Sequence, residues 1–332
     1  MLKLARQTSS ETISSRALAV GVASVMVPAG TLLRSRTPTC RRADQTVASH
    51  RASEPALARS VRQLEPGACG RLPVLVYHHV GPRRDGTHRS LTVSPAAFER
   101  HVRWLARTGF EALSSADVID WRRLGRPLPR RAFVLTFDDG YADLARFAFP
   151  VLRRYGFGAI VFLVSGRLGG TNAWDEVAGS GTHRLLSANQ VREWAAKGIE
   201  FGAHGRTHAD LTDRSTDLAE EVERSATDLE GLLGYRTRSF AYPFGLVDEA
   251  AVGEVRRTFD LAFTAHPGLN TIWTDPHLLR RTMVQPGDTL LDLRFRLLTG
   301  SNLLDRVRGA IRVRTRIRAV HRSLGRQRSH AR

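Results

Sequence analysis

Cysteine is nearly absent from this chain of 332 residues. The two that occur, Cys40 and Cys69, both precede the first strand-like segment. They support neither a disulfide framework nor a metal site with thiolate ligands. Lysine is equally scarce, because Lys3 and Lys197 are the only two. The basic residues are therefore almost all arginine, which coding bias explains as readily as selection for a polyanionic partner.

The body of the chain also lacks a strong charge of one sign, although the net charge is +18. Residues 1–71 contain 11 Lys and Arg against 4 Asp and Glu, and residues 305–332 contain 10 against 1. The two ends therefore carry +7 and +9, and only +2 remains for the segment between them. Because that segment also shows no recognised nucleic-acid motif, we expect no nucleic-acid partner.

No apolar run has the length and continuity of a membrane span. The longest candidate, residues 17–33, is short and is interrupted by Pro28. Basic residues precede it, as in the first two regions of a signal peptide. We expect residues 1–71 to be a weakly structured leader, containing a signal or short anchor, and the protein to be secreted or associated with the cell envelope. The alternative is an upstream extension outside the folded protein.

Strand-like and helical segments alternate through the rest of the chain, which is typical of a parallel sheet covered by helices. The expected strands are Val74–Tyr77, Ala132–Phe137, Ala159–Val164, Ile199–Ala203, Ser239–Tyr242, Leu261–Thr264 and Leu279–Val284. The expected helices are Pro95–Thr108, Tyr141–Tyr155, Ser187–Lys197, Asp213–Leu233, Val247–Arg257 and Leu290–Leu298. In barrels built this way, functional residues gather at the carboxyl ends of the strands.

Two adjacent carboxylates, Asp138 and Asp139, end the apolar run Phe133–Phe137 and are followed by Gly140. A buried strand cannot hold two charges, so both acids are expected at its carboxyl end. Successive side chains on a strand point to opposite faces, so the acids can share one site only if the backbone turns, which Gly140 permits. The alternative is that an aspartate simply caps the following helix.

A second polar group, His204 and His208, follows the strand-like run that ends at Ala203. The spacing of four residues places both imidazoles on one side of a helical turn, where they could bind one metal ion. A carboxylate and two histidines form a three-ligand set that leaves a position for water. The sequence therefore indicates a metal site, with the carboxylate supplied by the Asp138–Asp139 pair.

These motifs resemble those of a known family. Thr136–Gly140 reads T-F-D-D-G, His204–His208 reads H-x-x-x-H, and Arg238–Gly245 follows downstream. Together they resemble the NodB-type polysaccharide deacetylases, carbohydrate esterase family four, over residues 72–298. The resemblance implies a single distorted (β/α) barrel of about seven parallel strands and a deacetylase domain over residues 72–304. It also implies metal-dependent hydrolysis of acetyl groups on sugars.

The resemblance assigns a role to each site residue. Asp138 is the expected general base, and Asp139, His204 and His208 are the expected ligands of one divalent metal ion, with zinc favoured. By the same resemblance, the backbone N–H of Phe244 would stabilise the oxyanion and Tyr242 would line the pocket. No partner that would orient Asp138 is evident in the sequence.

Three departures from the family pattern affect these roles. Gly205 replaces the usual Ser or Thr after the first histidine, so the hydroxyl that would brace the metal loop is missing. Ala241 replaces the Arg that orients the base, and Arg238 lies three residues earlier. The usual downstream Leu-x-His motif is also absent. Members acting on poly-N-acetylglucosamine take the acid from a Tyr-His pair after the first strand, so His78 is the expected proton donor.

The expected function is removal of N-acetyl groups from an acetylated amino-sugar polysaccharide by a monomeric, metal-dependent hydrolase. An O-acetyl esterase acting on a glycan would use the same metal and base, and a carbohydrate-binding pseudoenzyme would keep only the fold. Trp174 either stacks on a sugar ring or holds its own long loop in place. Four other histidines are expected to have packing or surface roles: His101, His183, His266 and His277.

Residues 305–332 form the last expected region. Apolar residues recur there near helical spacing with arginines between them. Such a segment either lies as an amphipathic helix on an anionic membrane surface or is a solvated basic tail.

Overall fold

The computed structural model describes residues 70–82, 91–174 and 182–302. The expected tail over 305–332, and all but the last two residues of the expected leader over 1–71, lie outside these ranges. Within them, no helix is both long and apolar enough to cross a membrane. The domain boundaries, the cellular location, the membrane contact and the monomeric state remain predictions.

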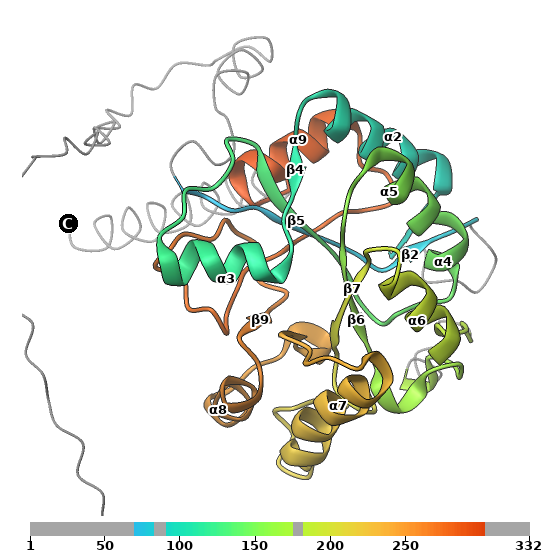
Figure 1. Cartoon of the computed structure of the whole chain (residues 1–332), viewed down its shortest axis with the longest axis vertical. Helices are drawn as coiled ribbons and strands as arrows, with labels where there is room; N and C mark the ends of the chain where they lie inside the picture. The colour runs from blue at the N-terminus through green and yellow to red at the C-terminus, as the bar shows by residue number, and fades with distance from the viewer. Residues whose placement is uncertain (1–69, 83–90, 175–181, 303–332) are drawn as a thin grey trace, which may run out of the picture. The chain divides into compact units, whose positions relative to one another are not determined.

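One sheet dominates the described part of the chain, and all seven expected strands belong to it (Figure 1). Its order is β10-β1-β5-β6-β7-β8-β9, every pairing is parallel, and the short strand β4 pairs with β5. These strands span Val74–Tyr77 (β1), Glu111–Ala112 (β4), Ala132–Phe137 (β5), Ile160–Leu163 (β6), Glu200–Ala203 (β7), Ser239–Ala241 (β8), Leu261–Phe263 (β9) and Thr282–Met283 (β10). A parallel bridge joins Phe263 of β9 to Leu279, in the segment that leads into β10, and the distorted (β/α) barrel is confirmed.

Helices surround the sheet in Figure 1. They span Pro95–Arg107 (α2), Ser115–Leu124 (α3), Asp143–Phe147 (α4), Phe149–Tyr155 (α5), Ala188–Ala195 (α6), Leu218–Leu233 (α7), Glu249–Thr258 (α8) and Leu290–Thr299 (α9). Two 3₁₀ turns, η1 (Ser165–Arg167) and η3 (Pro243–Gly245), follow β6 and β8, and a separate parallel pair is formed by β2 (His79–Val80) and β3 (Thr92–Val93).

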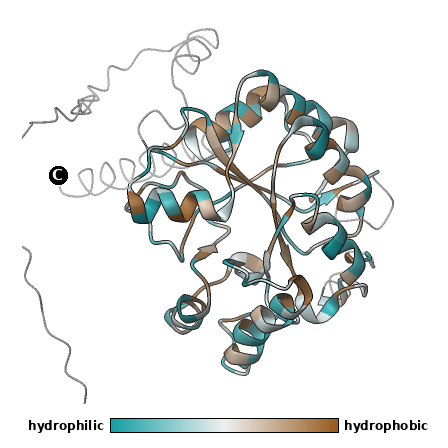
Figure 2. Cartoon of the chain, in the orientation of Figure 1, coloured by the Kyte–Doolittle hydropathy of each residue, from teal (hydrophilic) through white to brown (hydrophobic). Residues whose placement is uncertain are grey.

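The core has two layers because side chains alternate along each strand. On β5, Phe133, Leu135 and Phe137 pack in the cluster that also contains apolar residues of α2, α5 and α7. Ala132 and Val134 belong instead to a second cluster inside the barrel. Figure 2 shows the apolar strands at the centre and helices whose apolar residues share their surface with polar ones.

Four expected helices are found within two residues of their expected bounds, and the other two differ more. The pattern over Tyr141–Tyr155 forms two helices, α4 and α5, separated at Ala148. Pro150 occupies the first turn of α5, where its missing N–H needs no partner, whereas a continuous helix would bring its ring against the preceding turn. The helix expected from Asp213 begins at Leu218, because the Asp217 side chain caps it by accepting from the Glu220 N–H.

Helix α3 was not expected from the sequence, nor were the short strands β2, β3 and β4. Ser114 and Asp117 form a reciprocal capping box at the start of α3, and this local signal could have predicted the helix. Its buried residues Val118, Ile119 and Trp121 pack in the cluster inside the barrel. Helix α3 therefore covers apolar side chains that face the barrel interior.

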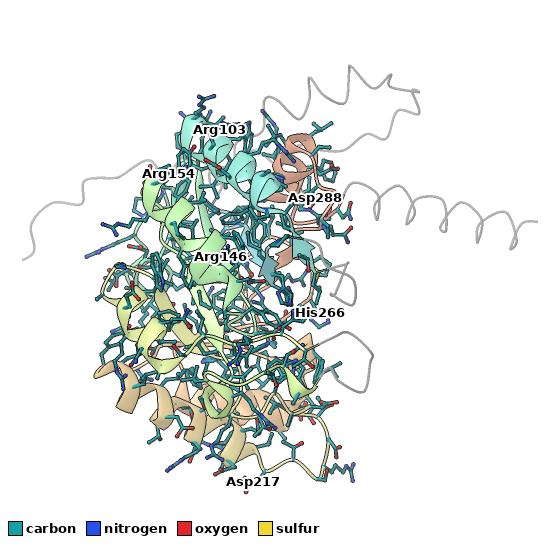
Figure 3. All side chains as sticks on the ribbon, turned by 90° about the vertical axis from the view of Figure 1, so that its right-hand side faces the viewer. Arg103, Arg146, Arg154, Asp217, His266 and Asp288 are labelled. Carbon is teal, nitrogen blue, oxygen red and sulfur yellow. The ribbon has the colours of Figure 1, made fainter. Side chains whose placement is uncertain are left out.

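A buried polar network ties α9 to α2 and β1. Arg296 donates two hydrogen bonds to Asp288, at 2.6 and 2.9 Å, and both side chains are at least nine-tenths buried. His101 lies between the Asp288 carbonyl and the Tyr77 hydroxyl, 3.1 Å from each, and burial lowers its pKa. The expected structural role of His101 agrees with this geometry (Figure 3 labels Asp288).

We predict that Asp288→Ala destabilises the fold by about 3–5 kcal/mol, because it leaves the buried Arg296 guanidinium without its counter-charge. The free energy of unfolding in urea would measure the loss. Asp120→Ala is the control, since Asp120 pairs with Arg126 at 2.7 Å on the surface and such pairs contribute about 0–1 kcal/mol. Equal losses in the two variants would contradict the role given to Asp288.

Candidate metal centre and active site

The backbone turns sharply where β5 ends, so that both aspartates reach the same cavity. Asp138 still pairs with the sheet through its N–H to the Tyr77 carbonyl, but Asp139 and Gly140 have φ values of 69° and 70°. A Cβ atom at Gly140 would lie 2.5 Å from Cδ2 of Leu163, so the site needs glycine there. The turn expected at Gly140 is present, and helix capping by either aspartate is wrong, because α4 begins only at Asp143.

Asp138 is held by Arg281, a residue that the sequence analysis did not select. The guanidinium donates from Nη1 to Oδ1 at 2.6 Å and from Nη2 to Oδ2 at 2.8 Å, and Arg281 is 2% exposed. Burial alone would raise the pKa of the Asp138 carboxyl, but the charge and hydrogen bonds of Arg281, together with His204 and His78, more than offset it, and the pKa lies below its ordinary value. Asp138 is therefore an oriented carboxylate rather than a carboxyl without a partner.

Asp139, His204 and His208 converge on one point. The Nε2 atoms of His204 and His208 lie 3.4 and 3.3 Å from the same oxygen, Oδ1 of Asp139. The three residues are buried, and one ligand atom from each lies within 4.8 Å of the others. Burial would raise the pKa of the Asp139 carboxyl, but the two histidines hold it well below its ordinary value.

The tautomer of His204 shows that this set suits a cation. Its Nδ1 lies 2.7 Å from the Ala241 carbonyl, which can only accept, so Nδ1 carries the proton. In the neutral ring, Nε2 then presents a lone pair toward Asp139. Two imidazole nitrogens and a carboxylate oxygen around one point are the donor set of a catalytic zinc site with an open position. The residues fit the expected divalent ion.

The loop that carries the two histidines is not helical, so the helical turn expected from their spacing is wrong. Gly205 and His208 both have positive φ, 75° and 70°, and the chain loops rather than coils between them. The two rings still meet edge to face, with centroids 4.8 Å apart. Loop geometry, not helical periodicity, brings the ligands together.

Glu221 on α7 braces this loop in place of the hydroxyl missing at position 205. The buried carboxylate accepts from the N–H groups of Arg206 and Thr207 at 2.9 and 3.0 Å, and from the Thr207 hydroxyl at 2.5 Å. A Cβ atom at Gly205 would lie 2.8 Å from Oε2 of Glu221. Gly205 therefore leaves room for a carboxylate brace that supports both histidine ligands from outside.

His78 and His79 point into different environments, as alternation along the chain predicts. His78 lines the cavity with Nε2 3.9 Å from Oδ2 of Asp138; burial lowers its pKa, and the nearby Asp139 and Asp138 oppose that effect. His79 instead lies 2.7 Å from Asp143 through Nδ1, and its ring stacks on Tyr141. The structure brings His78, and not His79, to the cavity that Asp138 lines.

Aromatic side chains surround His208. Trp174 stacks on its ring with centroids 4.5 Å apart, and Phe244 meets it edge on at the same separation. Phe244 has φ 57° and is 53% exposed, whereas Tyr242 is fully buried and donates its hydroxyl proton to the His277 carbonyl. Trp174 thus holds a ligand ring while also lining the cavity, which keeps both of its expected roles open.

All seven residues expected in the site line one cavity of about 220 Å³, together with Arg281 and Trp174. They are His78, Asp138, Asp139, His204, His208, Tyr242 and Phe244. A water molecule takes about 30 Å³ of liquid volume, so an acetyl group and several waters have room there. The other histidines of the described residues do not line this cavity; His266, labelled in Figure 3, is exposed.

Two residues of the site, Arg281 and Glu221, were missed by the sequence analysis. A signal existed for Arg281, because a charged residue within an expected buried strand needs a partner of opposite charge. Arg238, the nearer candidate in the sequence, is exposed before β8 and does not reach Asp138. Glu221 lies among the acidic residues of the first turns of α7, and nothing local separates it from Glu220, which is exposed.

Comparisons with known proteins agree with this geometry. The family model described as "Polysaccharide deacetylase" matches residues 125–259, which include both aspartates and both histidines. YxkH of Bacillus subtilis, assigned to the polysaccharide deacetylases, is 26% identical over 219 residues, covering 65% of this chain and 72% of that protein. Poly-beta-1,6-N-acetyl-D-glucosamine N-deacetylase of Escherichia coli is 28% identical over 215 residues, and the match spans 54% of this chain but only 32% of that enzyme.

A solved structure supports the fold independently. The deacetylase PplD of Streptococcus pyogenes, solved in complex with acetate, superposes with a TM-score of 0.60 at 23% sequence identity, covering 69% of this chain and 98% of that one. The family match, the relatives and the barrel lead to the same assignment. The chain carries a polysaccharide deacetylase domain, which the family model matches over residues 125–259.

Proposed function

We propose that this polysaccharide deacetylase removes N-acetyl groups from an acetylated amino-sugar polysaccharide and depends on a divalent metal ion, with zinc expected. One observation carries the proposal. A carboxylate fixed by Arg281, a three-ligand set and an imidazole 3.9 Å from that carboxylate line the same cavity. The names of the poly-N-acetylglucosamine deacetylase relatives favour an amino-sugar polymer.

Asp138 acts as the general base. Arg281 keeps the carboxylate ionised and fixes its orientation, since both carboxylate oxygens accept from one guanidinium. That interaction also weakens Asp138 as a base. A divalent ion held by Asp139, His204 and His208 would supply a water of lowered pKa and polarise the acetyl carbonyl. The residual basicity of Asp138 suffices for a water that is already acidic.

His78 acts as the general acid. An amide leaves as an amine and needs a proton, whereas the alcohol of an ester leaves more easily without one. His78 lies on the same cavity as the base and outside the ligand set, so its imidazole is free to hold that proton. This placement favours N-deacetylation over O-deacetylation. The backbone N–H of Phe244, in the η3 turn at the cavity, is the proposed oxyanion donor.

Acetate release from a panel of glycans tests the function. We expect release from poly-N-acetylglucosamine and chitin oligomers, its loss on treatment with a chelator, and recovery when Zn²⁺ is added back. Release from acetylated xylan alone would identify an O-acetyl esterase instead. Glycan binding without acetate release, in protein shown to contain metal, would identify a carbohydrate-binding pseudoenzyme.

We predict that Asp138→Asn lowers turnover by about a hundred- to ten-thousandfold, the usual contribution of a general base. Metal content should stay near that of the unsubstituted protein, because Asp139 and the two histidines form the ligand set. Metal analysis and a melting temperature on the same preparation would separate loss of the base from unfolding around Arg281. Loss of metal would make Asp138 a ligand, and unchanged turnover would remove it from the mechanism.

We predict that Glu221→Gln weakens zinc binding by about 10–100-fold, the usual effect of losing a group that orients metal ligands. The amide cannot accept all the hydrogen bonds that the Glu221 carboxylate takes from Arg206 and Thr207. Calorimetric titration of the metal-free protein with Zn²⁺ would measure the change. Glu220→Gln is the matched control on the same helix, because the only contact of the exposed Glu220 with this loop in the described residues is with the half-buried Arg206 side chain. Equal affinities for all three proteins would show that the brace has no effect.

We predict that His78→Ala slows amide hydrolysis by about a hundred- to ten-thousandfold. The same variant should partly retain hydrolysis of 4-nitrophenyl acetate, whose leaving group needs little protonation, and should retain metal. His79→Ala should leave the ratio of the two rates nearly unchanged, since His79 contacts Asp143 and Tyr141 outside the cavity. Equal mild effects from the two substitutions would refute the assignment of the acid.

A further inference from the structure

A second cavity, of about 420 Å³, lies at the end of the barrel opposite the active site. Its lining includes Arg236, which precedes β8, and Asp260, which precedes β9, whereas Tyr242 lines the active site from the carboxyl end of β8. Residues of α3, of α8 and of the connection from β9 to β10 form the walls. Figure 1 shows α3 and α8 on either side of β9 at this part of the barrel.

Arginine dominates the charge of this cavity. Five arginines line it: Arg122 and Arg123 from α3, Arg236 before β8, and Arg256 and Arg257 from α8. Asp260, also in the lining, accepts from Arg123 at 2.9 Å and from Arg236 at 3.1 Å. Two more carboxylates take part, because Asp275 pairs with Arg256 at 2.7 Å and Glu254 pairs with Arg257. The lining itself contains five guanidinium groups and one carboxylate, and Asp275 and Glu254 pair with two of the arginines from outside it, so positive charge is in excess there.

Among the five arginines, Arg122 has the positive charge that is least neutralised by nearby carboxylates. Its side chain donates to the carbonyls of Thr271, at 3.2 Å, and of Thr274, which are neutral acceptors. Burial lowers the pKa of the guanidinium, and Asp275 opposes that effect only in part. A negative charge in the cavity would therefore be stabilised by Arg122.

His277 provides an independent sign of a missing partner. Only 8% of this residue is exposed, and it lines the cavity. Its Nε2 lies 2.9 Å from the Phe259 carbonyl, so Nε2 carries the proton. Its buried Nδ1 has no hydrogen-bond partner in the described part of the chain, since the nearest carboxylate oxygen, of Asp275, is 3.7 Å away. A hydroxyl group of the ligand, or a water bound to it, would donate to Nδ1.

We propose that this cavity is a binding site for a phosphate group, separate from the deacetylase centre. A phosphate monoester carries about two negative charges near neutral pH, which matches the excess of positive charge. The planar guanidinium donates in a fork that fits phosphate oxygens, and arginine keeps its charge in partly buried sites. The volume exceeds what one phosphate needs, so a sugar or glycerol bonded to the phosphate also has room.

Titration of the full chain with inorganic phosphate at constant ionic strength tests the site. The double variant Arg123→Gln/Arg236→Gln removes both cations that flank Asp260 and should weaken phosphate binding by at least about tenfold, which is 1.4 kcal/mol. The control, Arg126→Gln/Arg154→Gln, removes the same charge from surface pairs of similar exposure, with Asp120 and Glu99. Arg154, labelled in Figure 3, lies on α5, which contributes no residue to this cavity. The control should bind phosphate like the unsubstituted protein.

Asp260→Asn gives a second, opposite expectation. It removes a carboxylate from the lining while keeping its shape, so phosphate should bind more tightly. Folding of each variant would be checked by its melting temperature. Acetate release from a short soluble substrate should stay unchanged in all of them, because none of these residues lines the active site. Equal phosphate affinity in the double variant, its control and Asp260→Asn would overturn the proposal.

Three probes distinguish the sources of the phosphate group once inorganic phosphate binds. Glucose 6-phosphate that binds at least tenfold tighter than inorganic phosphate would indicate a phosphorylated glycan. Phosphatidylglycerol vesicles that retain the protein through Arg123 and Arg236, where phosphatidylcholine vesicles do not, would indicate a lipid headgroup. Inorganic phosphate as the tightest of the three would identify the free ion as the ligand. No binding of any probe at millimolar concentration would also overturn the proposal.

Discussion

The buried ion pair between Asp138 and Arg281 is the constraint on which the active site depends. It joins the end of β5 to β10, the edge strand on the far side of β1, so one interaction spans three strands of the sheet. A buried carboxylate without this partner would be protonated or would move toward solvent. The pair thereby keeps a charged carboxylate in a cavity that aromatic and aliphatic side chains also line, and it does so next to Asp139, a member of the candidate ligand set.

The loop from His204 to His208 holds both histidines in place without a helix. Gly205 removes the side chain that would displace Glu221, and the carboxylate then binds two backbone N–H groups and a hydroxyl of the loop. His204 is fixed from the opposite side by the Ala241 carbonyl of β8. The two histidines are thus positioned by α7 and β8 together, in a chain that departs from the usual motif at position 205.

The two ends of the barrel have different chemistry. The carboxyl ends of the strands carry the carboxylates and imidazoles of the candidate deacetylase site, while the opposite end is lined by arginines, among them those on α3 and α8. The basic side chains of the domain are therefore not a uniform solvated surface, even though the domain is close to neutral. Helix α3 contributes both to the arginine-lined cavity and to the apolar cluster inside the barrel, so its position depends on the whole fold.

Local sequence determined the parts of this protein that depend on neighbouring residues. Seven strands, the turn at Gly140 and the alternation that separates His78 from His79 follow from periodicity and from the steric freedom of glycine. Parallel strands place their carboxyl ends together, so the gathering of Asp138, Asp139, His204 and His208 was also predictable. Contacts between distant segments were not. Arg281 reaches Asp138 across 143 positions, and Glu221 reaches Thr207 from a neighbouring helix. Only the tertiary structure decided these partners, because a buried charge requires a counter-charge but its sequence does not say which segment will supply it.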